Sequence, residues 1–229
     1  MTLVPSPTRR QVMRRRITVL TVLTLSLTAG TAWLVASSNP EFQRVLQPAQ
    51  LTVSVFVPFF GVLLVSDLHR SRSWSDARLG RRLVAAAVLA GGFAVAGLVI
   101  AATATAVAGG PWPPGARTAA LAWGAVWVQV IAQATGTAWG LLLRRPVLAM
   151  AATIVVPMSV TALLAVLDPG GGGARWITLY ENARSLLSGT ALPPALPVVV
   201  LLWCVIPNVL GRRLRRGTTL RSGEQPRAV

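Results

Sequence analysis

The 229-residue sequence contains no lysine, a single cysteine and a single histidine, and only 12% of its residues are charged. Soluble domains usually carry about a quarter of charged residues. A phosphate-binding loop needs a lysine that reaches the phosphates, so an ATP-hydrolysing site of that kind is excluded. A lone cysteine, Cys204, excludes an intrachain disulfide and a metal site built from cysteines. We therefore expect no enzymatic activity, no catalytic residue and no cofactor in this chain.

Long uncharged runs occupy most of the sequence, and 53% of its residues are hydrophobic. A helix needs about 20 apolar residues to cross a hydrocarbon layer of about 30 Å. We predict an all-α integral membrane protein: a bundle of six transmembrane helices at residues 17–211, between basic tails at 1–16 and 212–229. None of the predicted spans contains Asp, Glu, Lys, Arg or His, which argues against proton relays and metal chemistry within the membrane. The predicted spans are 17–36, 49–66, 83–107, 118–143, 147–167 and 195–211.

The distribution of arginine predicts the orientation of these helices. Eighteen of the 22 arginines lie in the two tails and in the connectors after the second and fourth spans. The other four lie in the remaining three connectors, and loops rich in Arg stay in the cytoplasm. Both termini are therefore expected in the cytoplasm. A net charge of +16 also suits nucleic acid, but arginines confined to short connectors favour contact with membrane lipids instead, and no nucleic-acid partner is expected.

Two segments have a second interpretation. Arg14–Arg16, an apolar run and then Val35–Ser37 resemble a cleavable secretory signal, although a run of 20 residues exceeds the usual 7–15 and favours an uncleaved first span. Cleavage would leave five spans. The last outer connector, 168–194, has apolar residues at roughly helical spacing from Trp176 to Leu187. This spacing predicts a short amphipathic helix at the outer surface, with an ordinary surface loop as the alternative.

Two glutamines are the most polar residues of the predicted membrane interior. Gln129 and Gln133 are four residues apart, so they share one face of the fourth span. Hydrogen bonding between helices and the lining of a translocation path are both compatible with this placement. Two pairs of small residues, Gly136 with Gly140 and Ala87 with Gly91, are spaced as in closely packed membrane helices.

The connector after the second span is unusually polar. Its sequence is VSDLHRSRSWSDARLGRR (Val65–Arg82), and it holds five arginines, two aspartates and the only histidine. Charge alone would keep it in the cytoplasm, where it can contact anionic lipids. A loop that only sets topology would not need Trp74 and two aspartates as well, so a docking surface for another protein is the competing interpretation.

The whole pattern resembles the type-2 permeases of ABC transporters, in particular small actinobacterial members. In that family the second span ends in a Glu-x-Arg-x-Gly-Thr-like element, which leads into a short cytoplasmic helix that docks on a separate ATPase. Asp67 stands at the glutamate position, whereas His69, Ser71 and Arg72 replace the arginine, glycine and threonine. The resemblance is carried by FFGVLLVSDLHR (59–70), RRLVAAAVLAGGFAVAG (81–97), GTAWGLLLRRPVLAMAATIVVP (136–157) and VVVLLWCVIPNVLGRRLRRG (198–217).

The resemblance implies a permease subunit of an exporter in a bacterial plasma membrane. Its partners would be a separate ABC ATPase and a second permease, either an identical copy or a related chain. A non-transporting membrane protein that anchors or regulates a partner is the alternative. The residues that the resemblance implies for coupling to the ATPase are Asp67, His69, Arg70, Arg72, Trp74 and Asp76.

The arginine distribution makes a direct prediction about topology. Reporter fusions after Arg82, Arg145 and Gly217 should report the cytoplasm, and fusions after Pro48, Gly115 and Gly173 should report the outside. The reason is that arginines resist transfer across the membrane and eighteen of them are assigned to the inner side. An outside carboxyl terminus would contradict the six-span arrangement.

Overall fold

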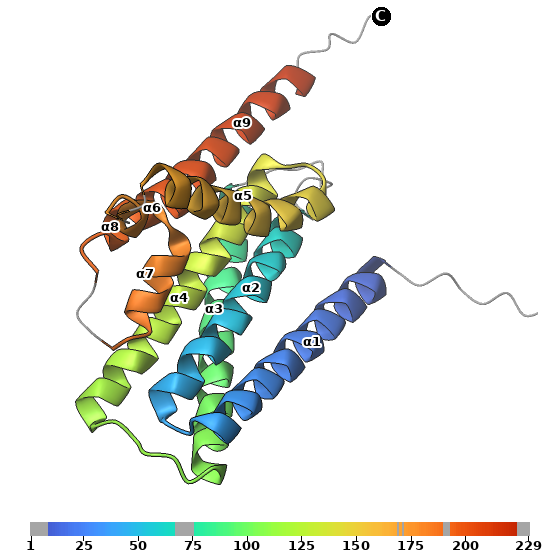
Figure 1. Cartoon of the computed structure of the whole chain (residues 1–229). Coiled ribbons are helices and arrows are strands. Elements are labelled where there is room, and N and C mark those ends of the chain that lie inside the picture. Colours follow the sequence, from blue (N-terminus) through green and yellow to red (C-terminus); the bar gives the residue numbers. More distant parts are fainter. Residues whose placement is uncertain (1–8, 67–75, 169, 171, 190–192, 224–229) are drawn as a thin grey trace, which may run out of the picture.

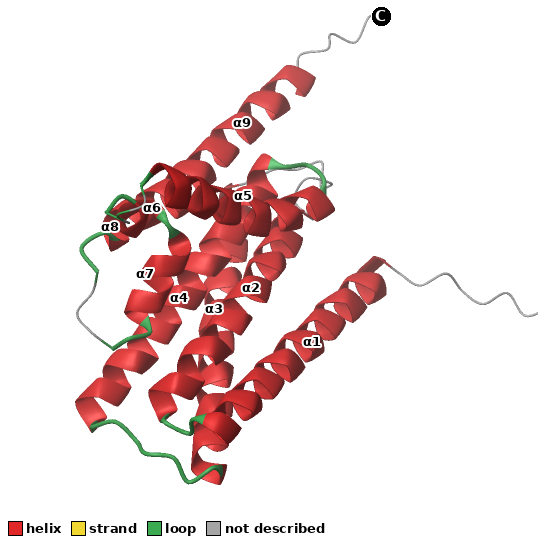
Figure 2. Ribbon diagram, in the orientation of Figure 1, coloured by secondary structure: helices red, strands yellow, loops and turns green. Residues whose placement is uncertain are grey.

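The structure is a computed structural model, and it describes residues 9–66, 76–168, 170, 172–189 and 193–223. Figure 2 shows that the described residues form helices joined by short connectors, and no strand occurs among them. Five long helices come first, followed by several short ones and a final long segment (Figure 1). The elements in chain order are α1 (Arg9–Ser38), α2 (Phe42–Ser66), α3 (Asp76–Val107), α4 (Gly115–Leu142), α5 (Pro146–Leu167), α6 (Ala174–Ile177), α7 (Leu179–Leu186), α8 (Leu196–Val200), η2 (Leu201–Val205) and α9 (Ile206–Gly223).

Five helices among the described residues are long and apolar enough to cross a membrane. This confirms the prediction of an α-helical protein with several apolar helices of membrane-spanning length. Each of the six predicted spans lies within a helical segment to within one residue at its ends, and α4 (Gly115–Leu142) corresponds to the one at 118–143. Glutamine, tryptophan, threonine and glycine lower the hydropathy of α4, and it is not among the five candidates. The candidates are Met13–Ser38, Phe42–Ser66, Ala77–Val107, Pro146–Leu167 and Leu196–Leu214.

The helices α2 and α4 form the centre of the bundle, with backbones in direct contact. A Cβ atom added to Gly136 of α4 would lie 2.1 Å from the carbonyl oxygen of Pro58 on α2. One added to Gly61 of α2 would lie 2.8 Å from the carbonyl oxygen of Gln133. Because neither glycine has a side chain, the helix axes approach as closely as backbones permit.

The two predicted small-residue pairs have different outcomes. Gly140 also faces α2, since its added Cβ would lie 3.0 Å from the Cα of Val62, so the packing role of Gly136 and Gly140 is confirmed. On α3, Ala87 is exposed, and nothing lies within 4 Å of a Cβ added to Gly91. The second pair therefore mediates no close helix contact within this chain. Side-chain burial, here by Phe93 against Phe60 of α2 with ring centroids 4.9 Å apart, holds α3 instead.

A π-helical turn, η2, interrupts the last long helical segment and ends two residues before Pro207. Pro207 has no N–H to donate to the preceding turn, which breaks the regular pattern of backbone bonds. The N–H of Ile206 instead bonds the carbonyl of Leu201, five residues earlier. The extra residue turns Trp203 and Cys204 into the bundle, where both are buried.

The connector predicted at 168–194 contains the expected short helix, α7, preceded by the single turn α6. The apolar face of α7 packs on the bundle, and Asn182, Leu186 and the following Leu187 are buried. A Cβ added to Gly124 of α4 would lie 2.2 Å from the carbonyl oxygen of Leu186, so α7 touches the α4 backbone. The indole Nε1 of Trp203 donates to the carbonyl of Ile177 at 2.8 Å and holds α6. One face of α7 thus packs against α4 while Tyr180, Glu181 and Arg184 are exposed, and its location at a membrane surface stays a prediction.

The contact between α2 and α4 predicts a strong effect of one methyl group. Gly136→Ala should lower the unfolding free energy by roughly 1–3 kcal/mol or more, because the new methyl overlaps the Pro58 carbonyl. The matched control is Gly91→Ala in α3, where the space is open, and it should stabilise the protein by up to about 1 kcal/mol because alanine is the better helix former. Thermal denaturation in detergent measures both. Equal stability of the two variants would contradict the contact.

Candidate functional site

A chain of buried amides links α2, α3 and α4. The Nε2 atom of Gln129 donates to both the backbone carbonyl and the Oε1 of Gln50, each at 2.9 Å. The Nε2 of Gln50 in turn donates to the carbonyl of Ala94 on α3, also at 2.9 Å. Gln50 and Gln129 are 0% exposed. Gly97 leaves room for Gln50, whose Nε2 would lie 2.7 Å from a Cβ at that position.

The second predicted glutamine also turns toward α2. When the Gln133 amide is turned by 180°, so that its oxygen and nitrogen exchange places, it donates to the carbonyl of Val57 and accepts from the N–H of Gly61 at 3.2 Å. The two glutamines thus lie on one face of α4, as their spacing indicates, and both are used in helix packing. A role in lining a translocation path stays a prediction.

Sequence reasoning missed the partner, Gln50. It stands at the edge of an apolar run, where it looks like a flanking residue that only extends a short span. The signal that would have found it is the cost of burying an amide without a partner. A membrane protein with two amides on α4 needs acceptors opposite them, and Gln50 is the only other glutamine in the predicted spans.

A further amide, Asn208, joins the last helical segment to α4. Its Nδ2 donates to the carbonyl of Ala134 at 2.9 Å and to that of Cys204 at 2.7 Å. Its Oδ1 accepts from the hydroxyl of Thr137 at 3.2 Å. A cavity of about 320 Å³ borders these groups and is also lined by Gln133 and Arg212. This cluster binds α9 to α4, the helix that also bonds α2.

A second cavity, of about 180 Å³, lies between α2, α4, α5 and α7. It is lined by side chains that include Ser54, Thr135, Thr153 and Thr161. Each of these four hydroxyls donates to a carbonyl three or four residues earlier in its own helix. The cavity therefore presents an apolar surface and contains no charged side chain in its lining. Its chemistry suits an apolar group and does not suit an ion.

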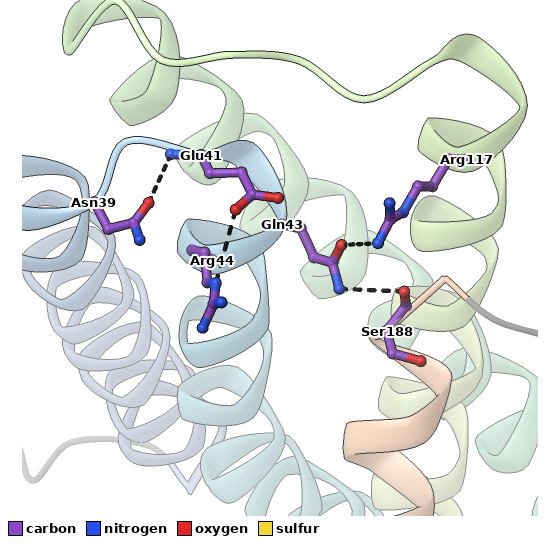
Figure 3. A network of polar contacts seen from close by, with 6 residues as sticks. All are labelled: Asn39, Glu41, Gln43, Arg44, Arg117 and Ser188. Carbon is purple, nitrogen blue, oxygen red and sulfur yellow. Dashed lines mark hydrogen bonds and ion pairs between the residues drawn. The ribbon is translucent and has the colours of Figure 1, made fainter.

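Polar contacts join α2, α4 and α7 at one end of the bundle (Figure 3). Gln43 at the start of α2 donates through Nε2 to the carbonyl of Ser188, at 3.2 Å, and accepts from Arg117 of α4. Next to it, the N–H of Glu41 donates to Asn39, and Arg44 pairs with the Glu41 carboxylate at 3.7 Å. These residues belong to the three connectors that the arginine distribution assigns to the outside. In the structure the three connectors meet at the same end of the bundle.

The polar connector is described only at its carboxyl-terminal end. The predicted coupling residues Asp67, His69, Arg70, Arg72 and Trp74, with the side chain of Asp76, lie outside the described residues. From Asp76 onward the chain is helical as the first turns of α3. Leu79 in these turns is 0% exposed and packs against Val65 of α2 and Leu141 of α4. Thus the end of the connector is attached to the two central helices.

The amide chain predicts energetic coupling between Gln50 and Gln129. Each Gln→Met change keeps the side-chain size and removes the hydrogen bond, so a double-mutant cycle should give a coupling of roughly 0.6–1.7 kcal/mol. The control cycle pairs Gln50 with Gln133, which bonds the α2 backbone instead, and it should be additive within about 0.5 kcal/mol. Unfolding free energies in mixed micelles measure both cycles. Additivity at Gln50 and Gln129 would contradict the observed bond.

Among the residues that the structure describes, no three His, Cys, Asp or Glu side chains gather in a group that suits a metal ion.

Comparison of the chain with protein-family models, with curated proteins and with solved structures finds no match. Arguments about function therefore rest on the residues themselves and on the contacts described above.

Proposed function

We propose that this chain is the transmembrane permease subunit of an ABC transporter, an exporter driven by a separate ATPase that docks on the cytoplasmic loop 67–82. The observation that carries the proposal is the burial of Leu79 between α2 and α4. A loop that served only to set orientation would need charge and no such attachment. An attached loop transmits force to the helices that line the apolar cavity.

The length of α3 supports this transmission. At about 1.5 Å per residue, its 32 residues extend roughly 48 Å, well beyond a hydrocarbon layer of about 30 Å. The first turns, which carry the exposed Arg81 and Arg82, then stand in the aqueous or headgroup region. A partner that pushes on loop 67–82 would tilt α3 as a rigid rod, and Leu79 would move α2 and α4 with it.

The proposed topology has six spans with both termini in the cytoplasm of a bacterial cell. Within it, α4 is the fourth span, and its polar side chains are compatible with the membrane because Gln129, Gln133 and Thr137 bond to neighbouring helices. The permease acts as a dimer with an identical or a related chain. ATP-driven closure of the two ATPase subunits would repack the spans between inward-open and outward-open states.

A second candidate function is that of a membrane protein which anchors or regulates a partner without transport. The interior amides favour it, because Gln50, Gln129 and Gln133 are all engaged in helix packing. The cavity of about 180 Å³ between α2, α4, α5 and α7 is also small. Co-purification with an ATPase whose hydrolysis depends on this chain discriminates between the two functions, and the absence of such an ATPase would remove the transporter proposal.

The docking proposal predicts separate effects of substitutions in the loop. Trp74→Ala and Asp67→Ala should leave insertion and orientation unchanged but weaken association with the ATPase more than tenfold, since an interface anchor typically contributes about 2 kcal/mol or more. The measurement is membrane insertion together with ATPase co-purification. Trp33→Ala is the control, because Trp33 on α1 is 60% exposed and lies far from the loop in sequence.

A variant at Leu79 separates docking from transmission. Leu79→Ala keeps the loop residues and removes the buried side chain that joins them to α2 and α4, so the ATPase should still bind while its stimulation by the permease falls. Val84→Ala, at a position that is 65% exposed, should have no such effect.

If ATPase association survives both Trp74→Ala and Asp67→Ala, the loop sets topology only and the proposal is wrong.

A further inference from the structure

The amino-terminal half of α1 packs only loosely on the bundle, where the partly buried Ile17 and Leu20 contact the core formed by α2 and α3. Buried side chains on α1 recur every four residues at Thr24, Thr28, Ala32 and Ala36, and from residue 13 to residue 23 none is fully buried. Figure 1 shows this half of α1 lying apart from α2. Between α1, α2 and α5 lies a groove of about 690 Å³. This volume is within the range of about 300–1,000 Å³ that ligand sites usually have.

The walls of this groove are apolar and come from three helices. One side belongs to α1, the floor includes α2, and the other side belongs to the first turns of α5. No acidic side chain is among the lining residues. The apolar residues of the walls include Val19, Leu20, Leu23, Leu63, Val147 and Met150.

The mouth of the groove is strongly basic. Arg15 and Arg16 of α1 line it and are exposed. Across from them, Arg144 and Arg145 are exposed and directly precede Pro146, which lines the opposite wall. An arginine fork matches a phosphate in geometry as well as charge. The groove therefore combines an apolar trench with two arginines in its lining and two more that precede its opposite wall in the chain, a combination that suits an anionic lipid.

We propose that this groove binds an anionic phospholipid from the leaflet on the side of the amino terminus. An acyl chain lies along the trench, and the phosphate lies among Arg15, Arg16, Arg144 and Arg145. Contact with a second copy of the chain fits the charges less well. In a two-fold contact the same surface faces itself, so arginines would meet arginines.

The proposal is tested on the full chain in detergent by native mass spectrometry with phosphatidylglycerol and phosphatidylcholine of identical acyl chains. Phosphatidylglycerol should bind more tightly. The double variant R15Q/R16Q should weaken its binding about 30-fold, from the usual attraction of each basic residue to an anionic surface. Removing two of eighteen inward arginines leaves the orientation unchanged.

Two further variants distinguish a groove site from general attraction. R81Q/R82Q removes the same charge from an exposed pair on α3, outside the groove, and should leave phosphatidylglycerol binding unchanged. Val19→Trp keeps every arginine and fills the trench from a position that is 59% exposed, so binding should fall about tenfold or more.

Three results would overturn the proposal. If R81Q/R82Q weakens binding as much as R15Q/R16Q, or if Val19→Trp has no effect, the lipid is attracted by charge alone and the groove is not its site. If Val19→Trp instead abolishes a dimer seen in the same spectra while lipid binding persists, the groove is an interface between copies of the chain.

Discussion

Direct backbone contact between α2 and α4 is the constraint on which the other contacts of this bundle depend. Gly136 lies against the carbonyl of Pro58, and Gly61 lies against that of Gln133. Any shift or rotation of one helix would therefore break its backbone contacts with the other. Such contacts are effective in membranes, where lipid tails remove the hydrophobic driving force between helices and packing must take its place. The bundle is organised around this pair.

The buried amides follow from that proximity. Gln129 reaches the side chain and backbone of Gln50, and Gln133 reaches the backbone of α2, because α4 is held close to α2 along one face. On a neighbouring face of α4, Thr137 and the carbonyl of Ala134 bond Asn208 of α9. Polar side chains of α4 thus form hydrogen bonds with both α2 and α9. These bonds explain how a helix of modest hydropathy occupies the centre of an apolar bundle.

The periphery is built differently. Exposed apolar side chains cover α5 and the outer face of α1, as expected for surfaces that face lipid, and α1 joins the bundle along only part of its length. At one end, Gln43, Arg117 and Ser188 tie α2, α4 and α7 together. At the other, Leu79 ties the polar connector to α2 and α4. The central pair therefore receives contacts from both ends of the molecule.

Much of this arrangement was predictable from the sequence, because apolar run length and residue spacing act locally. Uncharged runs of about 20 residues specify helices of spanning length, and spacing of four places Gln129 and Gln133 on one face. Helix ends were less predictable: α3 begins at Asp76, well before its apolar run, because Leu79 finds a buried place between two other helices.

Only the tertiary structure decided which partners the polar residues find. Both small-residue pairs have the same spacing, yet Gly136 touches α2 and Gly91 touches nothing, because spacing specifies a face and not its neighbour. Gln50 and Gln129 bond each other although they are 79 residues apart in the sequence. The sequence by itself determined helices, their apolar character and the placement of charge in the connectors, since these depend on neighbouring residues. Pairings between distant helices depend on three-dimensional packing, and no local pattern contains them.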